Sequence, residues 1–284
     1  MCIAGVLRRT APRAPALPLV VDSPHSGRVE PPDFGHAIGR ARLLATVDAL
    51  VDDLFDAAPQ HGATLLRALF PRTYIDPNRA PDDIDETLLA GRWPGRLRPS
   101  EKCSVGIGLI ARRDPIGPIY DRALSVDEVR TRIERYWWPY HRALGEALDT
   151  AHRRFGACWY LDCHSMRPLV GFAPGTGPDF VLGDGDGTTC EPELTALVAD
   201  ALRSAGYRVA LNDPYKGAEL IRRHCAPARG RHGLQIEVSR ALYLDAVRFA
   251  PGPGFERLRA DLTRLLGVVA DHVRARLSLA RAAE

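Results

Sequence analysis

The sequence predicts one α/β domain over residues 1–284, built on a mostly parallel or mixed central sheet flanked by helices. Strand-like and helical stretches alternate along the chain without a linker, which favours a single layered domain. Two apolar runs, at 17–21 and 159–161, end abruptly in acidic, imidazole and hydroxyl groups. Because ligands of open α/β sheets bind at the carboxyl ends of strands, we expect His25 and His164 to meet at that edge.

The composition is that of a globular protein and narrows the possible partners. Hydrophobic residues make up 45% of the chain and charged residues 26%, with a formal net charge of +3. The basic residues are mostly scattered arginines, which argues against nucleic-acid binding. No apolar run approaches the roughly 20 residues of a membrane span, and no signal-peptide core is visible near the start. Six cysteines without a CxxC pair indicate reduced thiols and a cytoplasmic location.

The first helix is expected over 38–58, where apolar residues recur with a helical period. Asp48 and Asp52 lie four residues apart in this stretch and would share a helix face. Such a pair is most often a solvated stripe, but Asp48 has apolar neighbours on both sides. Two strands, at 62–70 and 70–76, are expected to follow.

The middle of the chain predicts a loop followed by a long helix. Residues 80–103 are rich in proline, glycine and charge, which is typical of a long loop, and 104–111 predicts a strand. Ser125 begins a capping box, so we expect a helix from there to about residue 153. His141 in that helix is expected to be a hydrogen-bonded structural histidine.

The last part alternates turns, strands and helices. Residues 180–187 have a spacing that suggests a calcium loop but lack its final acid, so a turn is expected. The helix expected at 192–205 has proline in its first turn and glycine after its end. Strands are expected at 207–211 and 233–240, an extended segment at 219–224, and an amphipathic helix at 254–282.

The two histidines at the strand ends suggest a metal site. A zinc hydrolase takes three ligands from His, Asp or Glu and keeps one position open. His25 and His164 supply two of them, and the third could be Asp48, Glu30 or Asp162. Asp162 fits better as a carboxylate that orients an imidazole.

A carboxylate in the last strand is the candidate proton acceptor. Glu237 lies within an apolar stretch, where burial raises the pKa of a carboxyl group toward neutrality. The alternative is that Glu237 pairs with Arg240 or Arg222, and the sequence leaves both interpretations open.

Three side chains that bind anions lie close together in the sequence. Arg72, Asn78 and Arg79 could hold a substrate carboxylate, because the planar guanidinium matches its geometry. The alternative is a structural pairing of Arg79 with Asp76 or Asp82.

Seven motifs in this order resemble the N-formylglutamate amidohydrolase family, over about residues 17–245. They are SPHSG at 23–27, YIDPNR at 74–79, YH at 140–141, LDCHSM at 161–166, NDPYKG at 212–217, RRH at 222–224 and QIEVSRALY at 235–243. The resemblance implies a fold related to the zinc carboxypeptidases and aspartoacylases, of the phosphorylase/hydrolase type, and one catalytic zinc per chain.

The resemblance also implies roles for individual residues. His25 and His164 match the histidine ligands, Glu237 the general acid/base, and Arg72 the arginine that polarises the scissile carbonyl. The carboxypeptidase pattern has a glutamate three residues after its first histidine, where this chain has Arg28. We therefore expect Asp48 to be the third ligand.

The same resemblance implies how the substrate is held. Asn78 and Arg79 match the pair that grips a substrate carboxylate, and Arg222 or Arg223 could take a second one. The implied reaction is zinc-dependent hydrolysis of N-formyl-L-glutamate to formate and L-glutamate in histidine breakdown. The alternatives are a hydrolase of another N-acyl amino acid or small peptide, a noncatalytic protein that binds small acids, or a cysteine hydrolase that uses Cys163 or Cys225.

Overall fold

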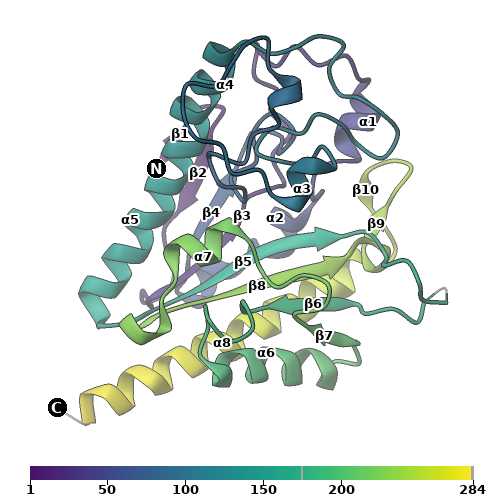
Figure 1. Cartoon of the computed structure of the whole chain (residues 1–284). Coiled ribbons are helices and arrows are strands. Elements are labelled where there is room, and N and C mark those ends of the chain that lie inside the picture. Colours follow the sequence, from purple (N-terminus) through teal and green to yellow (C-terminus); the bar gives the residue numbers. More distant parts are fainter. Residues whose placement is uncertain (174, 283–284) are drawn as a thin grey trace.

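The computed structural model describes residues 1–173 and 175–282 and has a central sheet between two layers of helices (Figure 1). The sheet has eight strands in the order β1-β2-β4-β3-β5-β8-β6-β7. Their bounds are Cys2–Ile3, Leu7–Thr10, Leu19–Ser23, Thr64–Ala68, Cys158–Met166, Phe180–Gly183, Val209–Leu211 and Arg231–Ser239 for β1 to β8. A two-stranded ribbon pairs β9, Leu244–Asp245, with β10, Ala250–Pro251.

The sheet is mixed, as the sequence predicts. The central strands β4, β3, β5 and β8 are parallel, whereas β2 and β6 run antiparallel to them. β5 and β8 pair over nine positions, from Cys158 with Arg231 to Met166 with Ser239. This register places His164 opposite Glu237 at the carboxyl ends of the strands.

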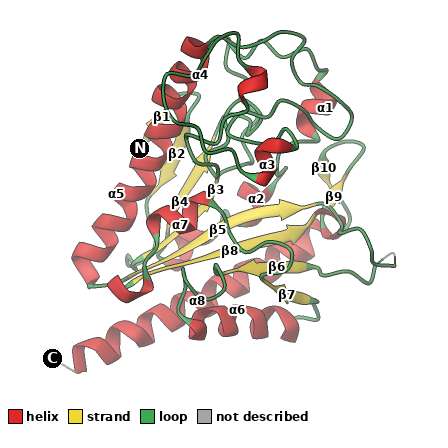
Figure 2. Cartoon of the chain, viewed as in Figure 1, coloured by secondary structure: helices red, strands yellow, loops and turns green. Residues whose placement is uncertain are grey.

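Helices cover both faces of the sheet (Figure 2). One face packs on α2, Val51–Leu54, α6, Pro192–Ser204, and α8, Phe255–Ala282. The other packs on α4, Val126–Arg132, α5, Trp138–Phe155, and α7, Glu219–His224. Because side chains alternate along a strand, Cys163 joins the core under α8, and Asp162 and His164 project from the opposite face.

The remaining helical segments are short. Two are α-helices, α1 (Arg40–Leu44) and α3 (Glu101–Ser104), and one is the π-helical η3 (Ile133–Trp137). The other four are 3-10 turns: η1 (Ala58–His61), η2 (Glu86–Leu88), η4 (Pro227–Arg229) and η5 (Arg240–Leu242). Ser125 caps α4 in a complete capping box, as expected. The expected helices near 192–205 and 254–282 are also present, and a turn follows β6 at 185–188. Within the described residues, no helix is long and apolar enough to cross a membrane.

The single helix expected over 38–58 is wrong. The chain forms α1, leaves helical geometry, and resumes at α2 after Leu50, whose φ is 65°. The backbone N–H of Asp48 donates to the His25 carbonyl at 2.9 Å, a bond that a continuous helix would not allow. The break therefore brings Asp48 to the end of β3, and Asp48 and Asp52 do not share one helix face.

Three other expectations were wrong in element type. Residues 70–76 form turns rather than a strand, because the Asp76 N–H donates to the distant Leu109 carbonyl. Residues 104–111 contain only the end of α3 and an isolated bridge between Ile107 and Ala111. Residues 219–224 form α7, a helix rather than an extended segment, with an ion pair one turn apart along it.

A buried arginine joins the loops above the sheet to α4. Arg132 is 1% exposed, and its guanidinium donates to the carbonyls of Tyr74 and Phe34 and to the Tyr120 hydroxyl, at 2.8–3.1 Å. The aromatic rings of these three residues surround the guanidinium. Because Tyr74 lies between Arg72 and Asn78, Arg132 fixes the loop that carries those site residues.

We expect Arg132→Met to lower the free energy of unfolding by about 3 kcal/mol, because buried acceptors would lose a charged donor. Urea unfolding measures the change. Arg130→Met is the matched control, since Arg130 is exposed on the same helix, and it should stay within about 0.5 kcal/mol of wild type. Equal stability of the Arg132 and Arg130 variants would contradict a structural role for Arg132.

Candidate metal centre

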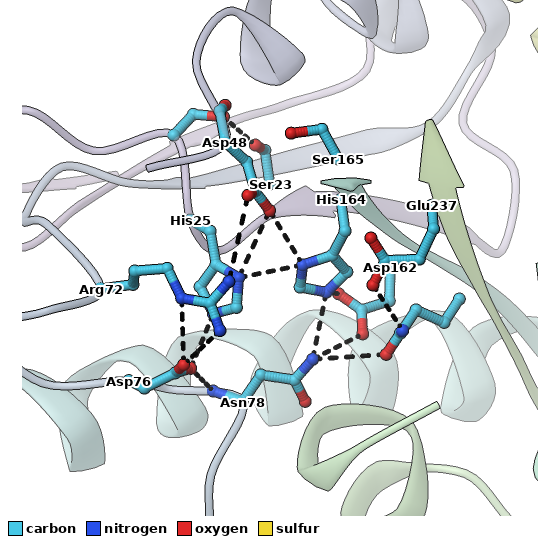
Figure 3. A network of polar contacts seen from close by, with 12 residues as sticks. Ser23, His25, Asp48, Arg72, Asp76, Asn78, Asp162, His164, Ser165 and Glu237 are labelled. Carbon is cyan, nitrogen blue, oxygen red and sulfur yellow. Dashed lines mark hydrogen bonds and ion pairs between the residues drawn. The ribbon is translucent and has the colours of Figure 1, made fainter. Parts of the chain in front are cut away.

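The carboxyl ends of three neighbouring strands bring the expected site together. His25 follows β3, His164 lies in β5, and Glu237 lies in β8. β3 and β5 pair with Asp22 opposite Asp162, and β5 and β8 pair with His164 opposite Glu237. Figure 3 shows the side chains of His25, His164 and Glu237 gathered in one place.

Three donor groups converge in the centre of this cluster. The Nδ1 atoms of His25 and His164 are 3.0 Å apart, and Asp48 Oδ2 lies 3.4 Å from the first and 3.3 Å from the second. All three residues are buried, at 1%, 2% and 1% exposure. Among the described residues they form the only group of His, Cys, Asp and Glu whose ligand atoms all lie within 4.8 Å of one another.

The far nitrogen of each imidazole is held by a second carboxylate. His25 Nε2 lies 2.6 Å from Asp76 Oδ1, and His164 Nε2 lies 2.7 Å from Asp162 Oδ1. The Asp76 carboxylate accepts a hydrogen bond from His25 Nε2, so in the neutral His25 imidazole Nδ1 carries the lone pair. The Nδ1 atoms of both imidazoles and a carboxylate oxygen converge on one point, an arrangement that a cation stabilises. The donor set of two imidazoles and one carboxylate fits zinc.

The positions of Asp48, Glu30 and Asp162 distinguish among these three candidates for the third ligand. Asp162 contacts the Nε2 side of His164, away from the convergence point. Glu30 pairs with His36 and Arg40 nearer the surface. Only Asp48 of the three faces both Nδ1 atoms.

The Asp48 and Asp76 carboxylates are ionised. Burial raises the pKa of Asp48, but bonds to His164 and His25 outweigh it and hold that pKa well below its usual range. Burial is likewise outweighed at Asp76, whose pKa is lowered by Arg72 and His25. For His164, burial lowers the pKa, but Asp162 and Asp48 raise it well above the ordinary value. The cluster thus attracts positive charge.

Glu237 lies beside this group without an ion-pair partner among the described residues. Its Oε1 accepts a hydrogen bond from Gln235 Nε2 at 3.0 Å, while Arg240 pairs instead with Asp48 at 2.8 Å. Burial raises the pKa of Glu237 to about 7; His164 lowers it and Asp48 raises it. The expected alternative, a pairing of Glu237 with Arg240 or Arg222, is absent from this structure.

The site opens into a pocket of about 810 Å³. Arg72, Arg79, Arg222 and Glu237 all line it. Arg79 bonds only to backbone carbonyls, and within the described residues neither Arg79 nor Arg222 has a carboxylate within salt-bridge distance. Two cationic groups therefore remain available in the pocket for an anionic ligand.

Two other expected anion-binding residues, Arg72 and Arg223, already have carboxylate partners. Arg223 pairs with Glu219 at 2.5 Å, lies over the Trp137 ring, and does not line the pocket. Arg72 lines the pocket and pairs with Asp76 at 2.7 Å.

The side-chain amide of Asn78 is buried and bonded on both ends. Its oxygen accepts from the Leu220 N–H at 2.8 Å, and its nitrogen lies 3.1–3.4 Å from atoms of His164, Asp162 and Gln235. Asn78 also lines the pocket, next to Arg79. In this structure the amide ties α7 to Asp162, the carboxylate beside His164.

His141 takes the structural position expected for it. Its Nε2 donates to the Pro77 carbonyl at 2.8 Å, so its Nδ1 accepts from His224 Nε2 at 3.0 Å. The ring stacks on Trp137 at 3.7 Å. Burial lowers the pKa of His141 to about 3 and that of His224 to about 4, so both are neutral near pH 7.

The cysteines do not form a nucleophilic site. Cys163 is fully buried on the sheet face opposite His164, and burial raises the pKa of its thiol well above the usual value. Burial also raises the pKa of Cys225. Neither thiol lines the pocket.

Sequence reasoning missed two residues that complete the centre. Asp76 was considered only as a partner for Arg79, yet it orients His25. Arg240 was considered only as a partner for Glu237, yet it pairs with Asp48. Both lie in stretches whose positions relative to the histidines depend on loop geometry.

The fold and the site together define a mixed α/β protein with a buried His–Asp–His centre at its strand ends, of the type used by metal-dependent hydrolases. The family model described as N-formylglutamate amidohydrolase matches residues 17–244. The chain therefore belongs to the N-formylglutamate amidohydrolase family.

Known proteins agree with this membership. The N-formylglutamate deformylase of Pseudomonas aeruginosa is 30% identical over 236 residues, covering 81% of this chain and 83% of the relative. That of Pseudomonas putida is 32% identical over 232 residues, with 81% and 82% coverage. The crystal structure of N-formylglutamate amidohydrolase from Ralstonia eutropha JMP134 superposes with a TM-score of 0.91 at 49% identity, covering 95% and 99% of the two chains.

Proposed function

We propose that this protein hydrolyses the formamide bond of N-formyl-L-glutamate, giving formate and L-glutamate, with one zinc ion bound by His25, Asp48 and His164. The observation that carries the proposal is the convergence of both Nδ1 atoms and Asp48 Oδ2 on one point, beside the Glu237 carboxylate, which has no ion-pair partner among the described residues. Relatives named for deformylation of N-formylglutamate support the substrate.

Each site residue has a separate role in the proposed hydrolysis. When bound, zinc would polarise the formyl carbonyl and lower the pKa of water. Asp76 and Asp162 hold the imidazoles in place through Nε2. Glu237, with its pKa near 7, accepts a proton from the attacking water and passes it to the leaving amine. Arg72 stabilises the negative charge that develops on the carbonyl oxygen.

The pocket suits a dicarboxylate substrate. In this proposal Arg79 holds the α-carboxylate of the substrate, and Asn78 fixes the protein backbone next to Arg79. Arg222, on α7, holds the side-chain carboxylate of the substrate. Both arginines line the pocket without a carboxylate partner within the described part of the chain. A neutral side chain on the substrate would leave Arg222 unpaired, so formylglutamate should be preferred to formylglutamine.

The setting proposed for this reaction is the degradation of histidine in the cytoplasm. The six cysteines are all free thiols, which is consistent with a reducing compartment.

We expect His164→Ala to lose its bound zinc and its activity, because one of only three protein ligands is removed. Asp48→Ala should weaken zinc binding as well, and Glu30→Gln is the matched control that should bind zinc like wild type. Metal analysis after dialysis measures the zinc content. Stoichiometric zinc in His164→Ala would show that the metal site is misplaced, and stoichiometric zinc in Asp48→Ala alone would exclude only the third ligand.

We expect Glu237→Gln to lower kcat at least about 10²-fold while zinc remains bound, the usual effect of losing a general acid/base. In wild type, kcat/KM should rise as pH increases through about 7, because Glu237 must lose its proton before it can accept one. In Glu237→Gln, kcat/KM should not show this rise with pH. Glu101→Gln, which changes another pocket carboxylate, should keep it. A near-normal kcat in Glu237→Gln would contradict the proposed role.

We expect Arg222→Ala to reduce kcat/KM for formylglutamate more than for formylglutamine, by roughly tenfold to 150-fold, because a charge-assisted hydrogen bond is lost. Arg79→Ala should impair both substrates. Arg223→Ala is the neighbouring control and should leave the ratio of the two substrates near wild type. Equal use of both substrates by wild type would instead indicate a broader N-acyl amino acid hydrolase.

A further inference from the structure

The two oxygens of Asp48 have different partners. Oδ2 faces the Nδ1 atoms of both histidines, whereas Oδ1 accepts a hydrogen bond from Arg240 Nη2 at 2.8 Å. Arg72 Nη1 lies 3.9 Å from the same Oδ1. The carboxylate thus turns one oxygen toward the metal site and the other toward arginine.

Arg240 is fixed by all three of its guanidinium nitrogens. Nε donates to Ser165 Oγ at 3.0 Å and Nη1 to the Ala45 carbonyl at 3.1 Å, in addition to the bond from Nη2 to Asp48. The side chain is 14% exposed. Because the guanidinium is planar and bonded through each of its three nitrogens, it cannot rotate without breaking several charge-assisted hydrogen bonds.

The backbone of Asp48 is also fixed. Its N–H donates to the His25 carbonyl at 2.9 Å, and its carbonyl accepts from Ser26 Oγ at 2.8 Å. With the backbone held at the end of β3, the orientation of the carboxylate depends on the side-chain contacts. Arg240 makes the shortest ion pair to it.

We propose that Arg240 restricts Asp48 to a single metal-binding oxygen and so keeps a coordination position free for water and substrate. A carboxylate can bind a cation through one oxygen or two, and a catalytic site needs an open position. If Oδ1 were released from Arg240, both oxygens of Asp48 could turn toward the histidines and fill that position. Arg240 is then a positioning residue. This inference rests on the proposed metal-dependent function.

The test uses the full-length protein loaded with Co²⁺ in place of zinc, because the visible absorption of Co²⁺ weakens as its coordination number rises. We expect the wild-type Co²⁺ protein to absorb strongly and to bind added azide at the open position. In Arg240→Met the cobalt should stay bound, its visible absorption should fall severalfold, and the azide dissociation constant should rise about tenfold or more, the scale typical of groups that orient a metal ligand.

Arg167→Met is the matched control. Arg167 is exposed and donates to the same Ala45 carbonyl at 3.3 Å. It has no bond to Asp48 in the described structure, so its variant should keep the wild-type spectrum and azide affinity. Thermal unfolding of each variant confirms that it is folded.

The outcomes separate this inference from the proposed function. If Arg240→Met keeps the wild-type spectrum and azide affinity, the inference is overturned and the proposed function is unaffected. The same holds if Arg240→Met folds but loses its cobalt. The inference is also overturned if azide does not change the spectrum of the wild-type Co²⁺ protein. This result does not depend on whether Arg240→Met folds. A wild-type protein that binds no metal would remove the proposed function and the inference with it.

Discussion

The convergence of two imidazole nitrogens and a carboxylate oxygen in a buried space is the constraint on which the site depends. Asp76 and Asp162 lie beside the Nε2 atoms of His25 and His164, and the two Nδ1 atoms face each other and Asp48. Such an arrangement is unfavourable without positive charge. The break between α1 and α2, the register of β3 with β5, and the turns at 70–76 all serve to build it.

The polar face of the sheet carries further buried charge beneath the centre. Asp22 and Asp162 are opposite each other on adjacent strands and both are fully buried. Burial and the charge of Asp162 raise the pKa of Asp22 well above its ordinary value, and the Tyr140 hydroxyl bonds to it at 2.7 Å. A protonated Asp22 keeps two adjacent carboxyl groups from both being charged in the interior. The parallel strands can therefore bring several acids to one edge.

The sequence predicted those parts of the structure that repeat with a local period. The strand ends that carry His25 and His164, the apolar β8 with Glu237, and the capped helix after Ser125 follow from alternation and capping. Asp48 looked helical because its neighbours are apolar at helical spacing, yet a hydrogen bond to His25 from outside the segment breaks the helix. The partners of Arg240 and Arg223 could not be predicted, because a long side chain reaches many acids and only the folded loops select one.

The contact between α5 and α7 has a consequence for the stability of the fold. His141 and His224 are neutral in the native state, with pKa values of about 3 and about 4, whereas both would titrate near 6.5 once unfolded. Between those values the unfolded chain binds more protons than the native one, so the free energy of unfolding falls as the pH drops below about 6.5. Because α7 carries Arg222 and donates the Leu220 N–H to Asn78, acid would loosen the part of the pocket that α7 lines through proton linkage, separately from any titration of Glu237.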